Sequence, residues 1–406
     1  PARPPPPPPL QLSRATRPMY PNVQSTGYQP QVDVVAATPV VAQGVAVATP
    51  VAGPSGVLPP APPSAKAQAN EAHLLEVLAA KGYPHGLTKE LLASRQHFPL
   101  RFWVVDNSGS MQSADGSRLV TDAHGNRRMI GCTRWAELVE TVGLAAEVAV
   151  ALDARTDFAL LNPAAGVPHV LTVGADPQGL PVPPGHCVDL AGIKQAMMRV
   201  SPAGTTPLTE AVMRVCSLVA PIEGELRARG QQAVLTLATD GQPNDPASFE
   251  QALRALTALP IWVVVRLCTD EDAIVNYWSD LDAKLELPLE VLDDERGEAR
   301  EVVAHNPWLT YGQPLHIARA LGLHNKLFDL LDERPLLPTQ LKAFCELLLG
   351  CGTLPEPELD RAAFVAALEE ALTAAPAVFD PLTLRETAWV KPHSTFGRLA
   401  GCCTIA

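Results

Sequence analysis

The fold is decided by the stretch FWVVDNSGSM at Phe102–Met111. Its apolar start predicts a buried strand, and the glycine allows the turn that follows the aspartate. In the pattern Asp-x-Ser-x-Ser, oxygen-bearing side chains recur at alternate positions near the strand end, so they can project together into a crevice at the carboxyl edge of a sheet. One carboxylate and two hydroxyls are hard donors that suit Mg²⁺, Mn²⁺ or Ca²⁺ and do not suit zinc.

Two later motifs can complete such a site. The stretch GTTPL at Gly204–Leu208 places threonines just before a helix whose first position is a proline. The stretch LATDGQP at Leu237–Pro243 ends another apolar strand in an aspartate and a tight turn. Three side chains from the first motif leave an octahedral ion incomplete, and these two motifs offer further oxygens.

At these three motifs the sequence resembles the von Willebrand factor A family, also called integrin I-like, over about Leu100 to Ala304. In that family the motifs form a metal-ion-dependent adhesion site, and they occur here in the family's order. The resemblance implies a metal site for Mg²⁺ or Mn²⁺. Its residues would be Asp106, Ser108, Ser110, Thr206 and Asp240.

The resemblance also implies a role for each ligand type. The two serines would bind the ion directly, and the threonine directly or through water. The two aspartates would act mainly through bound waters or as hydrogen-bond acceptors for the groups that bind the ion. Thr205 remains an alternative to Thr206. An open metal position would accept a carboxylate from a protein partner.

Strand and helix patterns alternate through the middle of the chain, which predicts an α/β fold with a Rossmann-like, doubly wound and mostly parallel sheet. The predicted strands are Leu100–Val105, Asp157–Leu161, Val167–Val173, Ala233–Ala238, Pro260–Leu267 and Pro288–Leu292. The predicted helices between them are Arg134–Leu152, Asp189–Val200, Pro207–Val219, Pro246–Thr257 and Asp272–Lys284. Later helices are expected near Pro314–Leu321, Pro338–Leu349 and Arg361–Ala374.

The expected organisation has five parts. They are a disordered arm at 1–69, a short helical lead-in at 70–99 capped by Asn70, the von Willebrand A-like domain at 100–305, a helical extension at 306–390 and a flexible tail at 391–406. The arm holds 17 of the 41 prolines, including the run Pro4–Pro9, so it cannot bury enough surface to order itself. It is interpreted as a spacer, with a polyproline ligand as the alternative.

An insertion after the first motif predicts a β-hairpin, with strands Ser117–Thr121 and Asn126–Ile130 beside the metal. It carries Arg118, Arg127 and Arg128. These arginines form either a partner-selecting arm for an acidic ligand or an ordinary solvated surface.

Charge and cysteine usage limit the function classes. The net charge is −12, which disfavours binding to nucleic acid phosphates. Eight scattered cysteines without zinc spacing favour a reducing, cytoplasmic location. The terminal Cys403-Thr404-Ile405-Ala406 fits a prenylation pattern, with Cys402 available for palmitoylation, so membrane association is expected only if this tail is lipidated.

The expected function is non-enzymatic protein binding by an adaptor or scaffold through the divalent-metal site. The alternatives are a structural or assembly role in which the metal only stabilises the fold, and a metal-dependent phosphoester hydrolase. The hydrolase is disfavoured because Ser108 stands where a haloacid-dehalogenase-type enzyme needs an acidic general acid/base. A serine nucleophile is disfavoured because the glycine that leads a nucleophile elbow is missing.

Overall fold

In a computed structural model, the described residues are 65–122, 124, 127–174, 186–269, 271–285 and 289–394. Most of the predicted arm and the tail with Cys402 and Cys403 lie outside them. No helix among the described residues is long and apolar enough to cross a bilayer.

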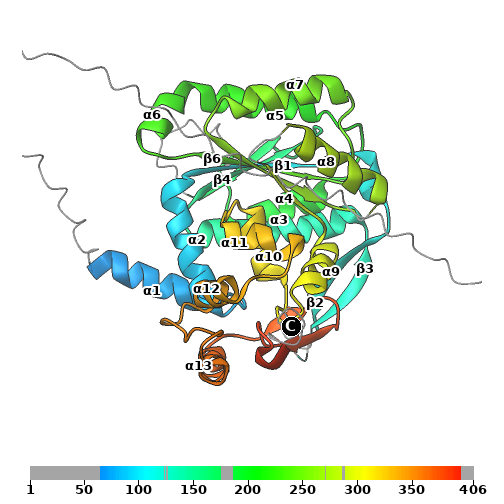
Figure 1. The fold of residues 1–406 in the computed structure, drawn as a ribbon. Coiled ribbons are helices and arrows are strands. Elements are labelled where there is room, and N and C mark those ends of the chain that lie inside the picture. Colours follow the sequence, from blue (N-terminus) through cyan, green and yellow to red (C-terminus); the bar gives the residue numbers. More distant parts are fainter. Residues whose placement is uncertain are drawn as a thin grey trace, which may run out of the picture. The chain divides into compact units, whose positions relative to one another are not determined.

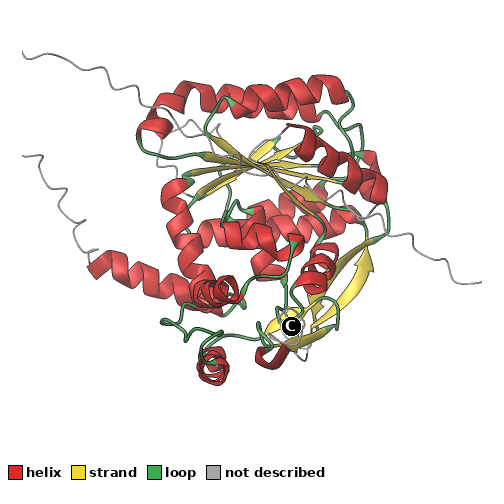
Figure 2. Cartoon of the chain, in the orientation of Figure 1, coloured by secondary structure: helices red, strands yellow, loops and turns green. Residues whose placement is uncertain are grey.

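The centre of the fold is a six-stranded sheet with strand order β5-β4-β1-β6-β7-β8 (Figures 1 and 2). Its strands are β1 (Leu100–Val105), β4 (Arg155–Leu160), β5 (Val170–Val173), β6 (Ala233–Thr239), β7 (Ile261–Leu267) and β8 (Leu289–Leu292). All neighbours pair in parallel except β5, which runs antiparallel to β4. From β1 the sheet is built first through β4 on one side and later through β6 on the other side, which is the doubly wound order. The predicted α/β fold class, with a doubly wound and mostly parallel sheet, is therefore confirmed.

Both faces of the sheet are covered, because side chains alternate along each strand. From β1, Phe102 and Val104 enter one apolar cluster, while Trp103 and Val105 enter another. The first face is covered by α5 (Leu208–Val219), α6 (Glu223–Ala228), α7 (Pro246–Thr257) and α8 (Asp272–Leu285), and η2 (Ala220–Ile222) joins α5 to α6. The second face carries α3 (Arg134–Ala151), α4 (Leu190–Arg199) and α10 (Gln313–Ala320).

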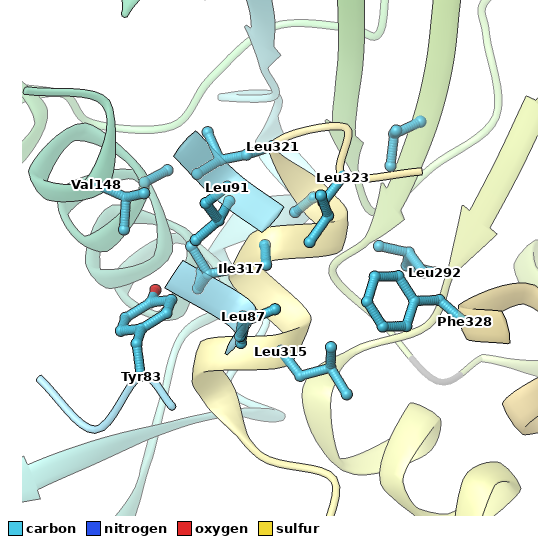
Figure 3. Packing of buried hydrophobic residues seen from close by; sticks show 14 of the residues in the cluster. Tyr83, Leu87, Leu91, Val148, Leu292, Leu315, Ile317, Leu321, Leu323 and Phe328 are labelled. Atoms are coloured by element: carbon cyan, nitrogen blue, oxygen red, sulfur yellow. The ribbon is translucent and has the colours of Figure 1, made fainter. Parts of the chain in front are cut away.

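The lead-in and the extension share the core of the second face. The lead-in comprises α1 (Ala65–Ala79) and α2 (His85–His97). Besides α10, the chain from Glu295 onward adds α9 (Glu295–His305), α11 (Lys326–Glu333), α12 (Pro338–Leu349), α13 (Arg361–Thr373), the strand pair β9 (Val378–Asp380) and β10 (Arg385–Thr387), and η3 (Pro392–Ser394). Figure 3 shows Leu87 and Leu91 of α2 beside Ile317 of α10 and Leu321, the residue after that helix, with Val148 of α3 close by.

Two contacts show how tightly α10 lies on the sheet. The buried Arg101 side chain donates from Nε to the Leu321 carbonyl at 3.0 Å, and Thr236 donates to the Ala320 carbonyl at 2.8 Å. Gly322, two residues after the end of α10, has a φ of +86°, and a Cβ there would lie 2.6 Å from a methyl of Val234. A larger residue would be strained both by its backbone and by this approach.

Several details differ from the sequence predictions. Helix α1 begins at Ala65 rather than at Asn70, because alanine-rich sequence before Asn70 already favours a helix. The sequence analysis did not predict α9, α11 or the β9–β10 pair. Helix α11 and the two strands are short, and elements of that length acquire most of their stability from tertiary packing.

A buried ion cluster joins β8 to the extension. Arg319, which is 1% exposed, donates from Nε to Glu290 at 2.8 Å and also bonds Glu298. Asp332 lies 3.7 Å from the same guanidinium. Burial raises the pKa of Glu290 to about 7, against the opposing effect of Arg319, and Oε2 of Glu290 has no partner among the described residues.

We predict that Glu290 makes the fold less stable as pH rises. Because its folded pKa lies above its ordinary value of 4.5, the folded state retains a proton that the unfolded state releases between pH 4.5 and about 7. Relative to E290Q, the wild type should lose up to about 3 kcal/mol of unfolding free energy across that window and then level off. Urea unfolding of both proteins between about pH 5 and 8 measures this difference. The exposed E358Q variant serves as control, and parallel curves for wild type and E290Q would contradict the prediction.

Candidate metal site

The site lies where the direction of sheet winding reverses. Val105, the last residue of β1, pairs in register with Ala238 of β6, and the next amide, that of Asp106, donates to the Ala238 carbonyl at 2.9 Å. Asp240 follows the end of β6. Since β1 connects onward to β4 on its other side, the crevice between β1 and β6 is a topological switch point, the usual ligand position in such sheets.

The two serines of the first motif meet the aspartate of the third. Oγ of Ser108 lies 3.1 Å from Oγ of Ser110, and Ser110 donates to Oδ1 of Asp240 at 2.8 Å. Ser108 is buried and Ser110, in η1 (Gly109–Gln112), is exposed. Oxygens of the first and third motifs, which are 130 residues apart, therefore face one another.

Asp106 is buried within a fixed set of hydrogen bonds. Its carboxylate accepts from the Ser108 amide at 2.8 Å and from the Thr239 hydroxyl at 2.5 Å. Burial raises the pKa of Asp106 above its ordinary value, and the charge of Asp240 adds to the rise, while the bonds from Thr239 and Ser108 oppose it. A nearby cation would favour the charged form of this carboxyl.

The threonine loop lies beside the other two motifs. The Gly109 amide donates to the Gly204 carbonyl at 3.2 Å, and Oγ1 of Thr206 would be 3.7 Å from a Cβ built on Gly241. Gly204 has a φ of +93°, and a Cβ there would lie 2.8 Å from Asn162, so glycine is required at this position. The hydroxyl of Thr205 instead accepts from Asn244 at 3.0 Å, which favours Thr206 as the residue that faces the site.

Three asparagines, which the sequence analysis did not single out, hold these loops together. Asn107, which is 1% exposed, accepts from the Asn162 amide at 2.7 Å and donates to the Asn162 carbonyl at 3.0 Å. Asn162 in turn donates to the Thr205 carbonyl at 2.8 Å. Asn244 accepts from the Thr206 amide at 2.9 Å. These hydrogen bonds connect the threonine loop with the loops that follow β1, β4 and β6.

An arginine that the sequence analysis also did not identify borders the site. Arg134 is the first residue of α3, whose start is capped by Thr133. Its side chain, 5% exposed, donates to Oδ2 of Asp240 at 3.0 Å and to Asp115 at 2.8 and 2.5 Å, and it also bonds Glu271. The hydrogen bond from Arg134 lowers the pKa of Asp115. Arg134 thus joins three segments of the chain through Asp115 in the loop after η1, Asp240 after β6 and Glu271 before α8.

The predicted hairpin is present as β2 (Gly116–Thr121) and β3 (Arg127–Cys132). Arg127 lies 3.5 Å from Glu386 and 5.8 Å from the ring centre of Phe379, so it contacts the C-terminal strand pair. Arg118 is half-buried, and Arg128 is exposed. Of the three arginines offered as contacts for an acidic ligand, Arg127 already has an acidic partner within the chain.

The donor set fits a hard divalent ion. The atoms brought together are hydroxyl and carboxylate oxygens, and the described residues place no cysteine or histidine among these hydrogen bonds. The two aspartates are almost fully buried, so a cation would offset the cost of their burial.

A second acidic group lies between α9 and α11. Single carboxylate oxygens of Glu298, Glu301 and Asp332 fall within 4.8 Å of one another. Two of these residues contact Arg319, which already places a cation beside the group. It lies apart from the three motifs and is better explained as part of the buried ion cluster.

Comparisons with known proteins yield weak likenesses. No protein-family model matches the chain, and no curated protein matches it. Among solved structures, a manganese-loaded Plasmodium vivax TRAP protein covers 50% of this chain and 72% of its own at 14% identity, with a TM-score of 0.30. Proximal thread matrix protein 1 from the mussel byssus covers 42% of this chain and 37% of its own at 15% identity, with a TM-score of 0.24. The fold description therefore rests on the strand order and register of this chain.

We predict that N107A lowers the unfolding free energy by about 1–3 kcal/mol, because it leaves the backbone amide and carbonyl of Asn162 without their partner. Denaturant unfolding measures the loss. The control is Q112A, since Gln112 makes one bond to the Pro202 carbonyl from an exposed position. A loss in N107A no larger than that in Q112A would show that the asparagine pairing does not hold the loops.

Proposed function

We propose that this chain binds a protein partner through a Mg²⁺ or Mn²⁺ ion held at Asp106, Ser108, Ser110, Thr206 and Asp240. The observation that carries the proposal is the meeting of all three motifs at the switch point, with Ser110 bonded to Asp240. The pieces come from distant parts of the sequence, and the fold brings their oxygen-bearing side chains to one point.

Each residue would have a distinct task. The hydroxyls of Ser108, Ser110 and Thr206 would bind the ion, while the buried carboxylates would hold its waters. Thr239 fixes one oxygen of Asp106, so that this carboxylate keeps its orientation. The bound ion would supply a Lewis-acidic position to which a carboxylate of the partner can bind. Since Ser110 is exposed, that position would be reachable from the surface.

We also propose that the chain is not an enzyme. The Ser108 hydroxyl contacts that of Ser110, and Asp106 accepts hydrogen bonds from Thr239 and Ser108. Among the described residues, the hydrogen bonds of Ser108 lead to no histidine that could act as a general base. A role in which the ion only stabilises the fold remains the second candidate, and the partner test below separates it from the first.

Divalent metal should stabilise the full chain by mass action, by about 2.7 kcal/mol when its concentration is 100 times Kd. We expect S110A to weaken metal binding at least about tenfold, because it removes a ligand without emptying the core. The control S113A, an exposed serine outside the hydroxyl set, should behave like wild type. Thermal melts in chelator and in excess Mg²⁺ or Mn²⁺ measure both effects. Equal metal responses in S110A and S113A would place the ion elsewhere.

The partner test uses the same pair of variants. A protein captured by the wild-type chain in Mg²⁺ should be lost in chelator and in S110A, and it should be kept by S113A, because a metal-bound carboxylate contact requires the ion. Quantitative affinity capture measures this pattern. A partner retained equally under all four conditions would show that binding is independent of the metal, and it would favour the structural role of the ion.

A further inference from the structure

We propose that Arg134 is a built-in cation that competes with the divalent metal for Asp240. The guanidinium and the ion would each weaken the binding of the other. This inference deepens the proposed function, because it concerns how tightly the same site holds its metal. It stands on the contacts of Arg134 rather than on the three motifs.

The first step is the use of Asp240. Its Oδ1 accepts from Ser110 at 2.8 Å and its Oδ2 from Arg134 at 3.0 Å, and its side chain is fully buried. Metal-bound waters would need these same oxygens as acceptors. Arg134 therefore engages one of the two carboxylate oxygens that Asp240 could offer to a hydrated ion.

The second step is charge. The Arg134 side chain is 5% exposed, whereas those of its other partners, Asp115 and Glu271, are 49% and 56% exposed. Water screens the two exposed carboxylates strongly, but it screens the buried Arg134–Asp240 pair much less. A positive charge held at Asp240 lowers the attraction of the site for a second cation.

The third step is what holds Arg134 in place. It lies in the first turn of α3, and its fork reaches three carboxylates from three segments of chain. Because Asp115 and Glu271 bind it from the solvent side, Arg134 need not leave the protein when its bond to Asp240 weakens. The metal can therefore replace Arg134 at Asp240 while Arg134 stays bound to Asp115 and Glu271. Coupling of this kind is reciprocal.

The test is isothermal titration of the full chain with MnCl₂ and with MgCl₂. R134M and R134Q both remove the charge, and R134Q keeps a side-chain N–H donor, so that the test can still be made if one of the two variants fails to fold. We expect the affinity for the ion to rise by about 5- to 150-fold, the range typical of coupled sites. Damage to a purely structural ion pair would lower the affinity or leave it unchanged.

The matched control is R155M. Arg155 is also 5% exposed and pairs with the buried Asp157 at 3.0 Å. It is the first residue of β4, however, and so lies at the end of that strand opposite to the carboxyl end. It should leave metal affinity unchanged. Unchanged or weaker binding in the Arg134 variants, with wild type binding, would overturn this inference and leave the proposed function intact. Binding by the variants but not by wild type would support the inference and overturn the proposed function. Absence of binding in all proteins would overturn both.

Discussion

The site depends on the parallel register of β1 with β6. Because Val105 lies opposite Ala238, the two strands end at the same level, and the residues that follow them emerge side by side. The ladder continues one step beyond β1 through the Asp106 amide, and the Thr239 hydroxyl then binds the Asp106 carboxylate. A slip of one residue would turn Asp106 toward the other face of the sheet and move the apolar side chains of β1 out of their clusters. Core packing and site geometry are thus fixed by the same pairing.

The sequence predicted the sheet and the site motifs because both leave strong local patterns. Leu100–Val105 is a nearly continuous apolar run, and the structure gives the strand these same bounds. Arg134 left no such pattern: it is simply the first residue of a predicted helix, and its partners Asp240 and Glu271 lie 106 and 137 residues away. The asparagine pairing was missed for the same reason, since Asn107 and Asn162 are 55 residues apart. Contacts between residues so far apart in the sequence follow from the topology of the sheet. The spacing of residue types along the chain does not predict them.

The extension illustrates a second limit. The apolar pattern near Pro314–Leu321 predicted a helix, but a helical period does not tell which surface the helix covers. In the structure that helix, α10, lies on the sheet itself, held by Arg101 and Thr236. The boundaries at 100 and 305 remain predictions, and the apolar core crosses both of them. A separate fold for 100–305 would leave the apolar surface beneath α10 open to water, at a cost of about 25 cal/mol per Å².

Arg319 and Arg134 are both buried arginines that supply positive charge to buried carboxylates, but their surroundings differ. Carboxylates brought out of water need a nearby positive charge, and Arg319 supplies one for Glu290 and Glu298 inside a closed core. Solvent has little access to this cluster, since Arg319 is 1% exposed and those two carboxylates are buried. At the candidate metal site, Arg134 is equally surrounded by carboxylates, but Ser110 and Asp115 open the same cluster to solvent. Access from outside is therefore what separates the closed Arg319 cluster from the position where we propose that a mobile cation takes the place of Arg134.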